Sequence, residues 1–159
     1  MQDKPYPAPP SVLEANEVLT AYRLSWVANF LSGPIYKEIE ARHGLSRPEF
    51  IVLFNCHHRP GSTARDICLA TGRPKNSISR AVLVLARDGR LVQQPNPEDA
   101  RQKRLVLTAA GEALYAAVIP LFKQREREML SVLTDEERTS FEVLLAKLAL
   151  RSDGWAEVF

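Results

Sequence analysis

The sequence predicts a mainly α-helical protein of the α+β class, and three observations support this prediction. Apolar residues recur with a period near 3.6 along most of the 159 residues, as they do on amphipathic helices. After Gly89 the period changes to two over two short runs, which is typical of a β-hairpin. Hydrophobic and charged contents of 45% and 25% are ordinary for a globular chain of one domain.

The first part of the chain is predicted to be an extended arm followed by a long helix. Residues 1–10 contain four prolines, which remove backbone donors and disfavour helix, so we expect a flexible arm. From Ser11 onward apolar side chains recur at helical spacing, with an interruption at Gly33 and Pro34. We expect a kink or a break at this interruption, and Gly44 would close the helix.

Local capping signals define the next two helices. Ser46 and Glu49 form an S-x-x-E capping box, and the apolar run behind them predicts a helix to about His58. A Pro-Gly pair then stops this helix. Either Ser62 or Thr63 caps the short helix that follows.

A helix that begins near Pro74 has the most informative pattern. Its apolar stripe at i, i+3, i+4 and i+7 consists of Ile78, Ala81, Val82 and Leu85. Cys68 and Gly72 precede it at the small and turn positions of a helix-turn-helix, in which Ile78 would be buried. The opposite face is rich in Arg, Asn and Ser, which can read base edges and hold phosphates. A merely solvated face is the alternative interpretation.

A β-hairpin and two more helices complete the chain. Residues 91–94 and 104–107 are predicted strands joined by a charged, turn-rich loop, which makes a wing behind the helix-turn-helix. Thr108 caps a helix to about Leu133, with a kink expected at Pro120. A second capping box begins at Thr134. The last helix has an apolar stripe formed by Phe141, Leu144, Leu145 and Leu148.

The apolar stripes of the terminal helices are too extensive for a compact winged helix to cover. Two-fold pairing with a second copy would bury them, and folding back on their own domain is the alternative. The sequence therefore predicts a winged helix-turn-helix with long N- and C-terminal dimerisation helices in one domain. Its parts are a flexible arm at 1–10, an N-terminal helical dimerisation region at 11–45, a DNA-binding region at 46–108 and C-terminal dimerisation helices at 109–159.

The charge distribution favours a polyanion as partner. His57 to Arg104 contain 10 Lys and Arg residues against 4 Asp and Glu residues, whereas the rest of the chain holds 11 against 15. A basic centre between mildly acidic ends is typical of a nucleic-acid-binding core on a scaffold.

Several other functional classes lack their sequence motifs. No apolar run reaches the roughly 18 residues that span a bilayer, and no signal peptide is visible, so we expect a cytoplasmic protein without membrane contact. No nucleophile elbow, P-loop, HExxH or dinucleotide motif is present, so an enzyme is not expected. Cys56 and Cys68 are predicted to be reduced thiols, and we expect no metal or cofactor, because Cys56, His57 and His58 are consecutive and diverge on a helix.

The order of elements resembles the MarR family of winged helix-turn-helix transcriptional regulators over nearly the whole chain. The most specific match is the wing pattern D-x-R-x-x-x-L-x-L-T-x-x-G, formed by Asp99, Arg101, Leu105, Leu107, Thr108 and Gly111. The resemblance implies a homodimer whose recognition helices enter successive major grooves of a pseudo-palindromic operator, about 34 Å apart. It also implies that the wing tips reach the minor groove, where Arg101 would enter and an ion pair with Asp99 would orient it.

The predicted DNA contacts combine this resemblance with the exposed helix face. Asn76, Ser77 and Arg80 are assigned to bases or groove walls, and Lys75, Arg87, Lys103 and Arg104 mainly to phosphates. The family commonly has a polar capping residue where this chain has Pro74, so the register of the helix stays open. The complete set is Arg73, Lys75, Asn76, Ser77, Ser79, Arg80, Arg87, Asp99, Arg101, Lys103 and Arg104.

The resemblance further implies a small, often aromatic or phenolic effector that releases the DNA, with repression the commoner outcome. Its predicted contacts are Trp26, Phe30, Tyr36, His57 and His58, and plain core packing is the alternative for each of them. Two other functions stay open at this point. One is a winged helix that binds only proteins, and the other is a regulator that senses oxidants through a cysteine, with the role of Cys56 undetermined.

Overall fold

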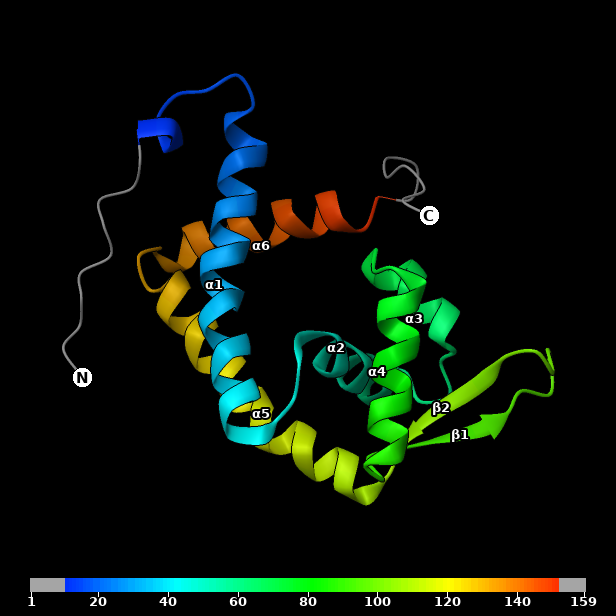
Figure 1. Cartoon of the computed structure of the whole chain (residues 1–159). Helices are drawn as coiled ribbons and strands as arrows, with labels where there is room; N and C mark the ends of the chain where they lie inside the picture. The colour runs from blue at the N-terminus through cyan, green and yellow to red at the C-terminus, as the bar shows by residue number, and fades with distance from the viewer. Residues whose placement is uncertain (1–10, 152–159) are drawn as a thin grey trace.

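The computed structural model describes residues 11–151, and Figure 1 shows their arrangement. The predicted arm at 1–10 and the last eight residues of the predicted C-terminal region lie outside the described residues. Within the described part, no helix is long and apolar enough to cross a membrane.

The first long helix differs from the prediction. A short 3-10 helix, η1 (Ser11–Leu13), precedes α1 (Leu19–His43), which starts later than expected and has no break at Pro34. Proline cannot donate to the carbonyl of Phe30 four residues earlier. That carbonyl accepts a hydrogen bond from Arg125 Nη2 at 3.4 Å, so a distant side chain supplies a donor where the helix lacks one. Gly44 ends α1 at φ +60°, as predicted.

The helix-turn-helix forms where the caps predicted it. The elements are α2 (Arg47–His58), α3 (Ala64–Thr71) and α4 (Lys75–Arg87). The Ser46 N–H donates to Glu49 Oε2 at 3.0 Å, and Thr63 makes the equivalent box with Asp66. Gly72 has φ +63°, the left-handed conformation that the turn between α3 and α4 requires. The predicted apolar stripe of α4 is buried, with exposed fractions of 0–5%.

The wing is an antiparallel hairpin of β1 (Leu91–Pro95) and β2 (Lys103–Leu107), with Leu91 opposite Leu107. The segment before α3 also pairs with β2. The Gly61 N–H donates to the carbonyl of Leu105 at 2.9 Å, and the Leu105 N–H donates to the carbonyl of Ser62 at 3.0 Å. The wing and the helix-turn-helix are therefore joined by main-chain hydrogen bonds.

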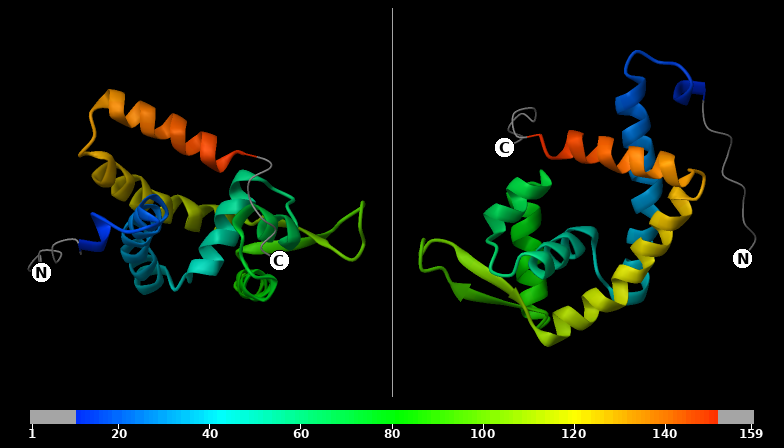
Figure 2. Two further views of the ribbon diagram at one scale, coloured as in Figure 1. Left: turned by 90° about the horizontal axis from the view of Figure 1, so that it is seen from above. Right: turned by 180° about the vertical axis from the view of Figure 1, so that it is seen from behind.

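The C-terminal half returns along the first helix. Thr108 caps α5 (Ala109–Leu130), which packs against α1 and α2 and passes through Pro120 without interruption. Thr134 caps α6 (Asp135–Ala149), which lies away from the wing (Figures 1 and 2). The core extends from α1 through α2 and α4 to the hairpin and α5. No residue of α6 is buried.

Gly111 has a steric role at the start of α5. A Cβ at this position would overlap the carbonyl oxygen of Arg90, and it would lie 3.3 Å from the Cβ of Leu107. We predict that Gly111→Ala lowers the free energy of unfolding by about 2 kcal/mol, the usual scale for overpacking. Urea denaturation measures the change. Gly33→Ala is the matched control, because a Cβ at Gly33 meets nothing within 4 Å, and equal stabilities of both variants would contradict the steric role.

Candidate nucleic-acid interface

The outward face of α4 carries most of the predicted DNA contacts. Its exposed residues are Lys75, Asn76, Arg80, Leu83 and Arg87, while Arg73, Ser77 and Ser79 are half-buried. Arg87 Nε pairs with Asp88 Oδ1 at 2.9 Å and stays largely exposed. The structure therefore places Asn76, Arg80 and Arg87 opposite the buried stripe of α4, with Ser77 and Ser79 beside it.

Pro74 occupies the capping position before α4. Its carbonyl accepts hydrogen bonds from Ser77 N at 3.0 Å and Ile78 N at 3.2 Å, and its side chain supplies no cap. The first helical residue is Lys75, so Asn76 and Arg80 lie one turn apart on the exposed face. In the structure, α4 therefore begins directly after Pro74.

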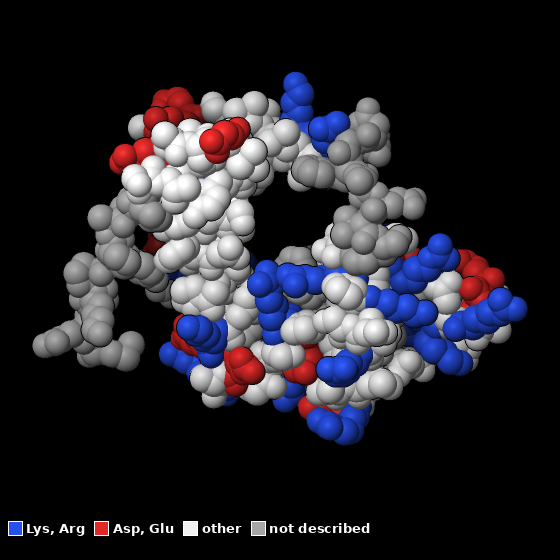
Figure 3. All heavy atoms as spheres, turned by 45° about the horizontal axis from the view of Figure 1, so that its top comes forward, with Lys and Arg blue, Asp and Glu red and all other residues white. Residues whose placement is uncertain are grey.

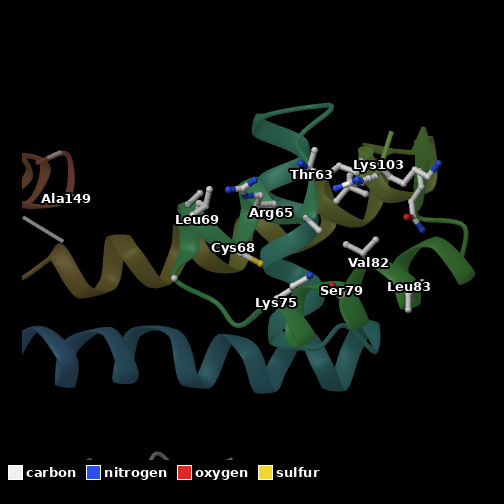
Figure 4. A pocket seen from close by; sticks show the side chains of 17 residues that line it. Thr63, Arg65, Cys68, Leu69, Lys75, Ser79, Val82, Leu83, Lys103 and Ala149 are labelled. Atoms are coloured by element: carbon white, nitrogen blue, oxygen red, sulfur yellow. The ribbon is translucent and has the colours of Figure 1, made fainter. Parts of the chain in front are cut away.

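A basic groove runs between the helix-turn-helix and the wing. Four cations line it, Arg65 from α3, Lys75 from α4, and Arg101 and Lys103 from the wing. Figure 4 shows Arg65, Lys75 and Lys103 around this groove, and Figure 3 shows Lys and Arg gathered over this part of the surface. Sequence reasoning missed Arg65. The signal that could have found it is its position in the first turn of α3, two residues after the capping residue Thr63 and three before buried Cys68.

The wing tip is shaped by Asp99, although not as predicted. Asp99 Oδ1 accepts the backbone N–H of Arg101 at 2.9 Å, and Oδ2 accepts Gln102 Nε2 at 2.8 Å. Both hydrogen bonds lower the pKa of the Asp99 carboxyl, and the one from Gln102 has the larger effect. The predicted ion pair between the two side chains is wrong, because the carboxylate is occupied by the turn. Arg101 itself is exposed, and no hydrogen bond or ion pair holds its guanidinium within residues 11–151.

The two cations of β2 differ in their surroundings. Lys103 is exposed beside the groove, in agreement with a phosphate contact. Arg104 instead donates from Nε to Asn96 Oδ1 at 3.2 Å and from Nη2 to Glu98 Oε1 at 3.1 Å. Most of the hydrogen bonding of the Arg104 guanidinium is therefore with residues of the wing itself.

A second cavity lies between α1, α2 and α5, and aromatic rings form a large part of its lining. Tyr36, His57 and His58 line it as predicted, whereas Trp26 and Phe30 do not. The latter two stack on each other on α1, with ring centroids 4.0 Å apart. Sequence reasoning missed the other aromatic lining residues, which are Phe50, Phe54, Tyr115 and Phe122.

Polar contacts between α2 and α5 border this aromatic cavity. His57 Nδ1 lies 2.6 Å from Glu112 Oε2, and His58 Nε2 lies 3.0 Å from the Tyr115 hydroxyl. The Tyr115 ring also stacks on His57 with centroids 3.7 Å apart. Burial, and to a smaller extent the charge of Glu112, raise the pKa of Tyr115. Tyr115 is therefore a neutral hydroxyl at physiological pH, able to donate and to accept a hydrogen bond.

The thiols are protected in different ways. Cys56 is 1% exposed, and burial raises its pKa to about 12. Cys68 lines the basic groove, and burial raises its pKa against the opposing effect of Lys75. No cluster of three or more metal-ligating side chains is present in the part of the chain that the structure describes.

Cys56 is predicted to be inert in the folded protein. Since the thiolate is the nucleophile, a pKa near 12 lowers its fraction at pH 8 by roughly three orders of magnitude. In a Cys68→Ser background, we expect iodoacetamide to modify Cys56 only after denaturant is added. Mass spectrometry follows the reaction, and rapid modification without denaturant would contradict this prediction and favour cysteine-based sensing.

The helix-turn-helix, the hairpin and the basic groove define a winged-helix protein of the DNA-binding type. Residues 43–102 match the MarR family model. The transcriptional regulator HosA of Escherichia coli O111:H- is 27% identical over 104 residues, which cover 65% of this chain and 77% of that protein. The chain is therefore similar to the MarR family over residues 43–102, and to a transcriptional regulator over 65% of its length.

Solved structures agree with this assignment at the level of fold. A MarR-family transcriptional regulator from Silicibacter pomeroyi has a TM-score of 0.75 at 23% identity, covering 86% of this chain and 92% of that chain. A second structure concerns regulation of DNA binding of Bordetella bronchiseptica BpsR by 6-hydroxynicotinic acid. Its TM-score is 0.70 at 21% identity, covering 82% of this chain and 98% of that chain.

Proposed function

We propose that this protein is a homodimeric repressor that binds a pseudo-palindromic operator and is released by a small aromatic ligand. The observation that carries the proposal is the basic groove between α4 and the wing. Lys75 and Ser79 of α4 line this groove together with Arg101 and Lys103, and Asn76 and Arg80 are exposed on the same helix. Side chains of this kind read bases in the major groove and neutralise phosphates. Arg101 at the wing tip is suited to a narrow minor groove.

Homodimerisation is supported by the uncovered faces of the terminal helices. Leu144, Leu145 and Leu148 of α6 are 61%, 41% and 46% exposed, and α1 exposes Tyr22 and Val27 in addition. Such contiguous apolar side chains on a soluble chain are typical of an interface. A second copy suits both helices, because a two-fold interface is reciprocal and buries the same apolar surface on both subunits.

The aromatic cavity supports the ligand part of the proposal. Its lining combines aromatic rings with the polar groups of His57, His58, Lys123 and Glu126, which favours a small aromatic compound that carries polar groups. The related structure of BpsR concerns control of DNA binding by an aromatic acid of this kind. Because the cavity touches both α2 and α5, an occupant would act on the connection between the DNA-binding lobe and the terminal helices.

Footprinting on the DNA beside the protein's own gene tests the proposal. We expect a two-fold symmetric footprint whose affinity falls steeply with salt, with a log–log slope of about −0.9 for each phosphate contacted. A screen of small aromatic acids is then expected to release the DNA. A winged helix that binds only proteins would produce no protected site and no steep salt dependence.

A further inference from the structure

The loop that joins the wing strands is built from two side-chain turns in succession. Asn96 Oδ1 accepts the backbone N–H of Glu98 at 3.2 Å, and Asp99 Oδ1 accepts that of Arg101 at 2.9 Å. Asn96 is only 9% exposed, so the first turn is the inner one and the second forms the tip. The position of Arg101 therefore depends on the turn at Asn96.

Arg104 ties this inner turn to β2. It lies opposite Gln94 in the hairpin and donates from Nε to Asn96 Oδ1 and from Nη2 to Glu98 Oε1. One guanidinium thus contacts both ends of the first turn. A fixed fork of donors can do this at once, whereas the single ammonium of lysine lacks that geometry.

The stem of Arg104 lies near the segment before α3. A Cβ added at Gly61 would lie 3.9 Å from Arg104 Cδ, so a methyl group there would just contact the stem. The same segment makes the main-chain hydrogen bonds to Leu105, the next residue of β2. Arg104 therefore stands where the wing meets the helix-turn-helix and extends from that junction into the loop.

We propose that Arg104 is a positioning residue that sets the place of Arg101 by holding the loop at Asn96 and Glu98, rather than a phosphate contact. This inference rests on the proposed function, since Arg101 matters only if the wing meets DNA. The exposed pair with Glu98 contributes little by itself, because surface ion pairs are weak. The contact with buried Asn96 is the one that constrains the loop.

Operator binding in paired backgrounds tests the proposal. Arg104→Ala and Arg104→Lys are each expected to weaken binding about tenfold, the loss that one or two constraining hydrogen bonds produce. In an Arg101→Ala background, measured at low salt, the same changes are expected to have almost no effect, since Arg104 acts through Arg101. The matched control is Lys103→Ala, an exposed cation whose loss is expected to be additive and to reduce the salt slope by about 0.9.

Amide hydrogen exchange without DNA separates this inference from the proposed function. We expect faster exchange of the Glu98 and Arg101 amides in both Arg104 variants and in Asn96→Ala, at an unchanged melting temperature. Unchanged exchange, additive losses with Arg101→Ala, or full rescue by Arg104→Lys would each overturn the proposal. If the unmodified protein protects no DNA, the proposed function fails, and the exchange result alone decides whether Arg104 positions the loop.

Discussion

Arg101→Ala is expected to reduce affinity for the operator by about hundredfold or more while leaving the fold unchanged. The guanidinium is exposed at the wing tip, and no hydrogen bond or ion pair with residues 11–151 depends on it. An arginine in a narrow minor groove meets an enhanced negative potential, so its loss removes both a contact and shape recognition. Fluorescence anisotropy with labelled operator measures the affinity.

Two further measurements make the Arg101 prediction specific. Arg101→Lys is expected to recover only part of the loss, because lysine keeps the charge without the planar fork. The thermal midpoint is expected to stay within error of the parent, since exposed substitutions away from special features change stability little. An alanine variant that binds the operator as tightly as the parent would contradict a role for the wing tip in DNA binding.

The second large effect is expected on the apolar face of α6. Leu144→Glu combined with Leu148→Glu places two charges on the face proposed to meet the second copy. Burying unpaired charges is costly, so we expect a monomer at micromolar concentration and loss of operator binding, because one recognition helix reads only half a site. Removal of residues 134–159 is expected to have the same result. Sedimentation velocity measures the mass.

Val143→Glu is the matched control for the α6 prediction. Val143 is 63% exposed and lies about 100° from Leu144 and about 140° from Leu148 around the helix, so its substitution adds a charge outside the proposed apolar face. We expect this variant to remain dimeric. A dimeric double variant with parental DNA affinity would show that the second copy does not cover this face.

Local chemistry made much of the fold predictable. The capping boxes at Ser46 and Thr134 are formed by residues three apart, so all of the interacting groups can be recognised in a short stretch of sequence. The continuity of α1 through Pro34 was not predictable in this way. It involves Arg125, which lies 91 positions further along the chain and donates to Phe30.

The candidate sites likewise combine features that depend on local sequence, which could be predicted, with features that depend on contacts between distant residues, which could not. The polar face of α4 follows from the period of one helix, and the structure shows it exposed where expected. The lining of the aromatic cavity depends on how α1 is rotated against α5, so spacing alone could not separate Tyr36 from Trp26. The charges of Arg104 and Asp99 suggested a phosphate contact and an ion pair. In the structure both side chains instead form hydrogen bonds with groups of the wing loop.

The main-chain pairing of Gly61 and Ser62 with Leu105 has a consequence for the length of the DNA site. If the protein binds DNA as proposed, the hydrogen-bonded connection between the helix-turn-helix and the wing would fix the number of base pairs between a major-groove contact and its minor-groove contact within each half-site. In a dimer, the adjustable quantity is the spacer between half-sites. An effector bound beside α5 would then alter the tolerated spacer length and leave the half-site sequence preference unchanged.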